Sequence, residues 1–282
     1  MDGHFRAFSL VDRITQLQAG KRAEGKFSVP AHLSRFSSCL AAEAAGQLAA
    51  WIAMAQLDFE LRPVAGVAAD LHFGADVRPG QTLDLAIEID SCDRDTVNYS
   101  AHAYADGVRI IELERSAGPM LPMEAFDAPD AMRRRYELLC GPGAPAGEFP
   151  GVAEHEIEII EEVHAKSSRA FLKVPHEAPF FSDHFPRRPV FPGTMLLDAH
   201  IQLALIAAER SAYWPPGARV IATAAPNLKL RAFIAPGDIV ELYVGLAPPD
   251  DSGVMTAQTR AYMNGKQVAM GSLQMAAMGA DR

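Results

Sequence analysis

The sequence predicts an α+β fold made twice, with each copy an antiparallel sheet wrapped around one long apolar helix. The main observation is an internal repeat. Residues 36–47 (FSSCLAAEAAGQ) and 191–202 (FPGTMLLDAHIQ) share a Phe, an acid seven residues later and a Gln four residues after the acid. Similar pairs of segments continue downstream at nearly the same offset, and one long offset indicates tandem domains rather than a solenoid, whose repeats are much shorter.

The elements of each copy follow from hydrophobic periodicity and turn residues. A single helix that is apolar on nearly all faces has to be buried, so the sheet must curl around it. Alternating stretches such as residues 82–89 predict three or four strands after each helix, and Asp106-Gly107 and Asn264-Gly265 predict tight hairpin turns between them. The expected ranges are a first strand at 8–15 and 155–163, a second strand at 23–29 and 168–174, and the helix at 38–56 and 193–210.

The domain organisation follows from the repeat and from one region of different composition. We predict a first unit at residues 1–122, a linker at 123–150 that is rich in Pro and Gly towards its end, and a second unit at 151–282. A chain of 282 residues has room for two domains of roughly 100–150 residues.

Composition narrows the class of protein. A net charge of −9 and a pI near 5.5 argue against a nucleic-acid binder. Cys39, Cys92 and Cys140 have no metal-like spacing and form an odd set, which favours a reducing cytoplasm and predicts neither metal nor other cofactor. The N-terminus does not resemble a secretory signal, and the longest apolar runs contain acids, so no membrane span is expected.

One segment of the second unit carries the strongest motif. It contains Phe180-Phe181, then His184-Phe185-Pro186, then a Pro-Val-x-Pro-Gly run over residues 189–193, and Asp198 fourteen residues after His184. This pattern resembles the signature of the β-hydroxyacyl-(acyl carrier protein) dehydratases, which are members of the hotdog-fold superfamily. The resemblance implies a tandem double hotdog that removes water from a (3R)-hydroxyacyl thioester, without a cofactor.

The residue types suit that chemistry. The imidazole of His184 is available as a base near neutral pH. A carboxylic acid in an apolar channel has its charged form disfavoured and can stay protonated to donate. The Pro192-Gly193 helix start leaves free N–H groups for a developing enolate oxygen, and the resemblance assigns that role to Gly193.

The identity of the acid remains open between Glu43 and Asp198. The resemblance implies that histidine and acid come from opposite units, which pairs His184 with Glu43. The first unit lacks a histidine loop, because five residues separate Pro30 from the next Phe where the second unit has fifteen between Pro175 and Phe191. Asp198 would then be a remnant or structural acid, unless His32 has moved into its half-site.

Other residues are expected to contact the substrate or its carrier. Residues predicted to line the channel are Phe181, Phe185, Pro192, Gln47 and Gln202. The two Gln residues could instead simply bond the acids one helical turn away. An acidic carrier protein or coenzyme A thioester needs a local positive patch, for which Arg187, Arg188, Lys229 and Arg231 are candidates.

Two features leave substrate and activity open. Asp183 stands where the family commonly has Gly, so its carboxylate either raises the pKa of His184 or faces solvent, and Arg187-Arg188 replaces a stretch that usually contains Gly. The alternatives to a dehydratase of fatty-acid, polyketide or polyene synthesis are a hotdog thioesterase and a non-catalytic acyl-binding subunit. A homodimer of double hotdogs is one expected assembly.

Overall fold

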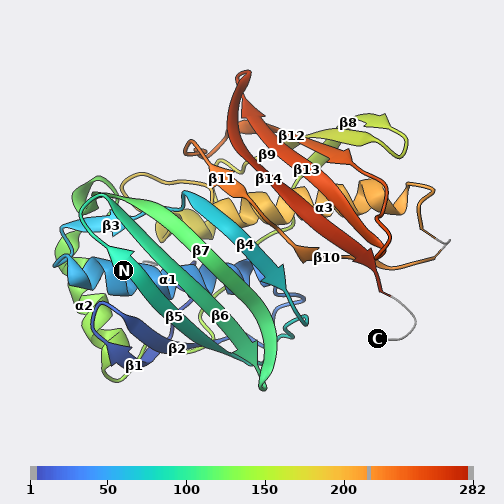
Figure 1. Ribbon diagram of the computed structural model, residues 1–282. Helices are drawn as coiled ribbons and strands as arrows, with labels where there is room; N and C mark the ends of the chain where they lie inside the picture. The colour runs from blue at the N-terminus through green and yellow to red at the C-terminus, as the bar shows by residue number, and fades with distance from the viewer. Residues whose placement is uncertain (1–4, 215–216, 279–282) are drawn as a thin grey trace.

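Two sheet-and-helix units with the same order of elements follow each other along the chain (Figure 1). The computed structural model describes residues 5–214 and 217–278. The first unit comprises β1 (Arg13–Gln18), β2 (Arg22–Ser28), α1 (Ser38–Gln56), β3 (Leu61–Pro63), β4 (Val67–Phe73), β5 (Thr82–Cys92), β6 (Thr96–Ala105) and β7 (Val108–Pro122). The second comprises β8 (Ile157–Val163), β9 (Ser167–Lys173), the 3-10 helix η2 (Pro179–Ser182), α3 (Gly193–Glu209), β10 (Val220–Ala224), β11 (Leu228–Leu230), β12 (Ile239–Leu246), β13 (Val254–Met263) and β14 (Lys266–Ala277).

The strands of both units join in one antiparallel sheet whose order is nearly symmetric. The order is β1-β2-β5-β6-β7-β4-β10-β14-β13-β12-β9-β8, so β4 and β10 meet at its centre. β11 adds a second connection, because it pairs with β14 of its own unit and with β4 of the other. This arrangement fits the predicted α+β hotdog architecture, and it brings α1 and α3 into contact across the middle of the molecule.

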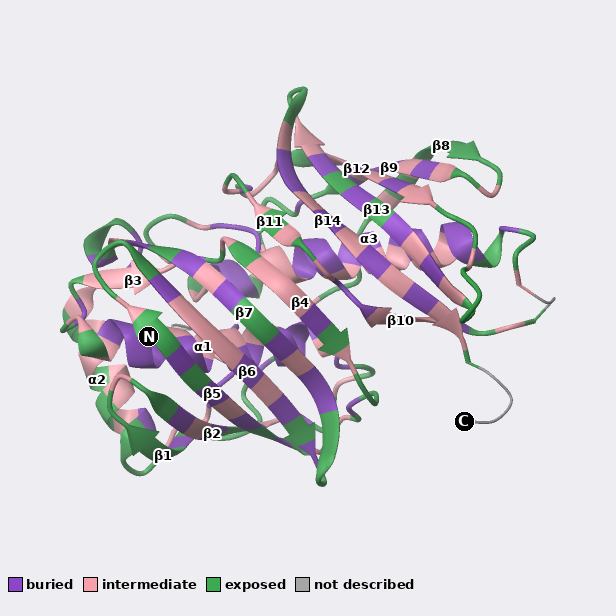
Figure 2. Cartoon of the chain, in the orientation of Figure 1, coloured by how far each residue is buried: buried purple, intermediate pink, exposed green. Residues whose placement is uncertain are grey.

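Each long helix forms the core of its unit. The buried residues of α1 and α3 lie against inward-facing positions of the strands, which alternate with exposed ones along β5 (Figure 2). Many of these residues are Ala, which allows a close approach of helix and sheet. Among the described residues α1 alone is long and apolar enough to span a membrane, but it is mostly buried inside the protein.

The two predicted hairpin turns are confirmed. Asp106 and Gly107 have φ of 51° and 76°, and Asn264 and Gly265 have φ of 50° and 73°. Two successive residues with positive φ are the geometry of the hairpin turn that Asn-Gly and Asp-Gly favour. These turns connect β6 to β7 and β13 to β14.

The first strand begins later than the sequence predicts. Residues 8–12 are not in a strand, and β1 starts at Arg13. The N–H groups of Phe8 and Leu10 donate to the side chains of Asp183 and Gln47 instead of to a neighbouring strand. The backbone is therefore hydrogen-bonded without joining the sheet, which a hydrophobic pattern cannot reveal.

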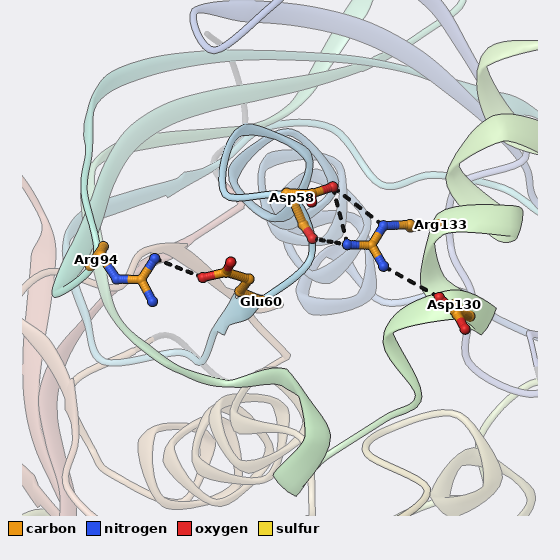
Figure 3. Close-up of polar contacts among 5 residues, drawn as sticks. All are labelled: Asp58, Glu60, Arg94, Asp130 and Arg133. Atoms are coloured by element: carbon orange, nitrogen blue, oxygen red, sulfur yellow. Dashed lines mark hydrogen bonds and ion pairs between the residues drawn. The ribbon is translucent and has the colours of Figure 1, made fainter.

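The segment between the units carries helical structure that docks on the first unit. It holds the 3-10 helix η1 (Met123–Ala125) and α2 (Pro129–Cys140), and α2 packs against α1 and β1. Arg133 of α2 forms an ion pair with Asp58, at 3.1 Å, and another with Asp130, at 3.3 Å (Figure 3). The turn after α1, where Asp58 has a φ of 49°, is thus tied to α2.

Candidate active site

A cavity of about 510 Å³ lies between the two units. Both core helices contribute to it, as do β6 and β7 of the first unit and the loop between η2 and α3. The residues that matter for its chemistry are Glu43, Gln47, Arg62, Tyr99, Ser116, His184, Phe185, Gly193 and Thr194. The two core helices, which are equivalent in the sequence repeat, therefore both contribute to a single cavity.

The ring of His184 is held in one tautomer. Its Nδ1 lies 2.7 Å from the carbonyl oxygen of Val190. A carbonyl can only accept, so Nδ1 carries the proton and Nε2 keeps a free lone pair. The ring stacks on Phe185, with centroids 4.2 Å apart, and meets the edge of the Phe8 ring at 5.6 Å. The imidazole is thus oriented as a base by its own loop.

The surroundings of His184 favour the neutral imidazole. Burial lowers the pKa of His184 below its ordinary value of 6.5. The nearby charge of Glu43 and the bond to Val190 act in the opposite direction, and the cation of Arg62 adds to the lowering. The net direction is downward, so the base is deprotonated at neutral pH.

Glu43 approaches this cavity from α1 and is held from both units. Its Oε2 accepts a hydrogen bond of 2.7 Å from the hydroxyl of Thr194 on α3, and its Oε1 accepts one of 3.0 Å from Gln47. Gln47 is itself fixed, since it donates to the Phe8 carbonyl and accepts from the Leu10 N–H, both at 2.9 Å. The carboxyl group therefore has a defined position next to the His184 loop.

The start of α3 provides polar groups at the same cavity. Pro192 precedes the helix and offers no capping side chain, so the first-turn N–H of Gly193 has no acceptor from the helix itself. The positive end of the helix dipole lies at this point. A Cβ on Gly193 would lie 2.3 Å from Cδ1 of Leu230, so a side chain here collides with the protein as well as with any ligand in the cavity.

Asp198 lies in a different environment, away from the cavity lining. Its Oδ2 is 3.0 Å from Nη2 of Arg35 and 3.1 Å from Nε2 of His155. Burial acts to raise the pKa of Asp198, but the bond and charge of His155, the charge of Arg35 and a bond from Ser37 outweigh it, and the pKa is lowered. Among the described residues no hydrogen bond or ion pair joins Asp198 to His32, which the sequence left open as a partner, and Arg35 and His155 take that place.

Asp183, the residue that replaces a usual glycine, holds the N-terminal segment in place. Its carboxylate accepts hydrogen bonds from the backbone N–H groups of Phe5 and Phe8, the latter at 2.7 Å. It therefore anchors the N-terminal segment beside His184.

The predicted substrate-contacting residues divide into two groups. Phe185 and Gln47 line the cavity, whereas Phe181, Pro192 and Gln202 do not. Phe181 is buried against Phe180, with ring centroids 4.4 Å apart, and Pro192 is enclosed at the start of α3. Gln202 lies one helical turn after Asp198, on the side of α3 that Asp198 occupies. A role of these three residues in substrate contact stays a prediction.

Two of the four predicted docking residues line the cavity. Lys229 and Arg231 line it and are exposed, while Arg187 and Arg188 are exposed on the His184 loop. Arg187 donates to the Glu124 carbonyl at 2.9 Å. The guanidinium of Arg188 lies 4.5 Å from the centroid of the Phe233 ring.

Several residues of the site were not identified from the sequence. Thr194 was detectable in principle, because it is a polar residue directly after Pro-Gly in an otherwise apolar run. Arg62, Arg35 and His155 gave no signal, because their approach to the site depends on how loops return to the core. Of these, only Arg62 and Thr194 line the cavity.

Comparison with known sequences finds similarity over most of the second unit. Residues 155–272 match the model of the FabA-like domain family. A 3-hydroxyacyl-[acyl-carrier-protein] dehydratase FabZ from Rickettsia massiliae is 35% identical over 79 residues, which are 28% of this chain and 54% of that protein. The FabZ of Thermus thermophilus is 28% identical over 124 residues, 44% of this chain and 87% of that protein. The match thus spans little more than half of the first relative's length.

Solved structures with the same fold cover nearly the whole chain. The dehydratase domain of PpsC from Mycobacterium tuberculosis, in complex with C12:1-CoA, aligns over 96% of this chain and 100% of its own, with a TM-score of 0.56 and 13% identity. A 12:0-ACP thioesterase from Umbellularia californica aligns over 92% of this chain and 95% of its own, with a TM-score of 0.56 and 10% identity. At these identities the likeness establishes the hotdog fold of the chain.

Proposed function

We propose that the protein dehydrates (3R)-hydroxyacyl thioesters to 2-enoyl thioesters, because residues 155–272 match the FabA-like domain family within a chain of hotdog fold. The observation that carries the proposal is the convergence of His184 and Glu43, from different units, on one cavity. Relatives named as 3-hydroxyacyl-[acyl-carrier-protein] dehydratases support the reaction class.

His184 acts as the base in this proposal. Its Nε2 lone pair takes the proton from the α-carbon of the thioester, while the Nδ1–H bond to Val190 keeps the ring in place. The negative charge that develops on the thioester oxygen is stabilised by the N–H of Gly193 at the start of α3. In this proposal His184 takes the proton, and the N–H of Gly193 stabilises the negative charge that the electron pair of the broken C–H bond leaves on the thioester oxygen.

Glu43 acts as the acid. In its protonated form it gives its proton to the β-hydroxyl, the carbon–oxygen bond breaks, and the C–H electron pair becomes the double bond of the enoyl product. Water leaves, His184 holds one proton and Glu43 has lost one. Transfer of the proton from His184 back to Glu43, through water or through the hydroxyl of the next substrate, restores the starting state. Thr194 and Gln47 hold the carboxyl group in position.

The acyl group arrives as a thioester of a carrier protein or of coenzyme A. An acidic chain repels an acidic carrier unless a local positive surface offsets this. Lys229 and Arg231 at the cavity, together with the exposed Arg188 that contacts Phe233, are candidates for such a surface. We propose that the protein works in cytoplasmic lipid or polyketide synthesis.

The decisive experiment follows enoyl formation by absorbance on a panel of (3R)-hydroxyacyl thioesters. Turnover is expected from the wild-type chain and is expected to be lost in His184→Ala. Release of free hydroxy acid without enoyl product would show a thioesterase. Binding of the acyl thioesters without turnover would show an acyl-binding subunit, and either result overturns the proposal.

A further inference from the structure

One wall of the cavity carries a cation that the proposed mechanism does not use. Arg62 of β3 lines the cavity, and only 12% of its side chain is exposed. Its Nε and Nη1 are enclosed and have no hydrogen-bond partner among the described residues. Guanidinium donors that are removed from bulk water and lack acceptors destabilise the protein, so a ligand that supplies acceptors at this point is favoured.

The contacts of Arg62 balance its charge but do not satisfy its donors. The nearest acid is Asp127, whose Oδ2 is 3.9 Å from Nη1, longer than a hydrogen bond. The guanidinium carbon lies 4.2 Å from the centroid of the Phe185 ring, a contact that supplies attraction but accepts no strong hydrogen bond. Burial lowers the pKa of Arg62 to about 10 in spite of Asp127 and Glu43, and the side chain remains a cation at neutral pH.

The wall of the first unit that faces the cavity also carries two hydroxyl groups. Tyr99 of β6 and Ser116 of β7 are cross-strand neighbours, and both line the cavity. Burial and the nearby Glu43 raise the pKa of Tyr99 to about 12, so its hydroxyl keeps its proton and can donate. The small Gly46 lies next to it on α1, since a Cβ there would be 3.4 Å from the Tyr99 oxygen.

We propose that Arg62 determines specificity by donating hydrogen bonds to a neutral oxygen acceptor of the thioester. A neutral acceptor is favoured over a carboxylate because Asp127 already compensates the charge, so acceptors are what the cation lacks. Two parts of the substrate contain such oxygens: the acyl chain beyond the reacting carbons, and the amide carbonyls of the pantetheine arm. The inference rests on the proposed dehydration and names the chemistry of its substrate.

The test compares two substrate series in wild type and Arg62→Met. In the first series, chains of equal length carry either no further oxygen or one keto oxygen stepped along the chain. In the second, the same acyl group is carried on pantetheine or on a plain alkyl thiol. Binding of unreactive thioether analogues is measured by calorimetry beside kcat/KM, so that affinity is read even if no turnover occurs.

The two sources of the acceptor give different results. An acyl acceptor predicts a wild-type preference of about 10- to 100-fold for one keto chain, which falls to near unity in Arg62→Met. A pantetheine acceptor predicts no acyl preference but a similar loss on pantetheine only. An equal loss of affinity for every ligand would show that Arg62 only supports the loop between η2 and α3. No loss of affinity would show that solvent satisfies the donors of Arg62. Both results overturn the inference about Arg62 and leave the proposed dehydration intact. If the binding preference is present but no turnover occurs, only the proposed dehydration is contradicted.

Two further variants guard against misfolding and nonspecific effects. Arg62→Met combined with Asp127→Asn avoids leaving an unpaired buried carboxylate, and it is expected to show the same change in preference. Arg62→Lys keeps the charge but loses the planar fork, so most of the preference should disappear. Arg94→Met is the matched control, because Arg94 is an exposed arginine that pairs with Glu60 at 2.8 Å outside the cavity (Figure 3).

Discussion

Each core helix carries an acid at the same position of the repeat, and we call each acid with its surroundings a half-site. The two half-sites have different environments. Glu43 of α1 bonds to the Thr194 hydroxyl of the other unit, and Asp198 of α3 contacts the Cys39 thiol at the equivalent position of the repeat. Glu43 then faces a cavity and a histidine, whereas Asp198 faces Arg35 and His155. Whether each acid is placed for reaction or for stability therefore depends more on the residues packed against it than on the acid itself.

The first turns of α1 and α3 also differ in whether their N–H groups are bonded by a side chain of the protein. Ser37 accepts a hydrogen bond from Leu40 N at the start of α1 and is also bonded to Asp198. The equivalent residue before α3 is Pro192, which provides no cap, and Gly193 follows at the cavity. One helix start is closed by its own side chain and the other is available to a ligand. Loss of the histidine loop and closure of the helix start therefore occurred on the same half-site.

Removing the acid of each half-site should give the largest contrast. Glu43→Gln is expected to lower kcat by about 10²–10⁴-fold, because the proton donor is lost. Asp198→Asn, the matched change on the other helix, should leave kcat within a few-fold of wild type. Full activity in Glu43→Gln, or a comparable loss in Asp198→Asn, would reverse the assignment of the two half-sites.

The two helix starts can be compared by placing alanine at the first helical residue of each. Gly193→Ala is expected to lower kcat/KM by about 10- to 1000-fold, since a Cβ there lies 2.3 Å from Leu230 Cδ1 and disturbs the N–H that stabilises the oxyanion. Ser38→Ala, its counterpart at the first residue of α1, should have almost no effect on kinetics. Combining Gly193→Ala with Leu230→Ala separates the causes: recovery to wild-type rates would assign the whole loss to the collision with Leu230.

The contrast between the half-sites was partly readable from the sequence. The pairing of His184 with Glu43 could be proposed because the motif spacing and the missing loop are linear features. The partners of Asp198 could not, because Arg35 and His155 are far apart in the chain and meet only after folding. The start of the first strand was misplaced for a similar reason, since distant Asp183 and Gln47 bind the backbone N–H groups that a strand would use.

The structural role of Asp198 should appear in stability rather than in rate. Its pKa is lowered in the folded chain, so its contribution is fully present above the ordinary value of 3.8 and is lost as the pH falls through the lower folded value. Asp198→Asn is expected to reduce the free energy of unfolding by about 1–2 kcal/mol at pH 7, given that Arg35 is largely exposed. Denaturant titrations at neutral pH and near pH 3 measure this, and an equal deficit at both values would contradict the ionic role.

The smallest expected effect concerns the charge that Arg62 places near the working half-site. Burial and Arg62 lower the pKa of His184, and the base must be neutral to act, so the acid limb of kcat/KM in the wild type should have its midpoint below the ordinary histidine value of 6.5. Arg62→Met removes a positive charge, which stabilises the imidazolium and moves the acid limb to higher pH. Arg94→Met is the control for a charge change outside the cavity. A limb that moves to lower pH in Arg62→Met, or moves equally in both variants, would show that Arg62 does not act on His184, and the electrostatic difference between the half-sites would then arise from burial alone.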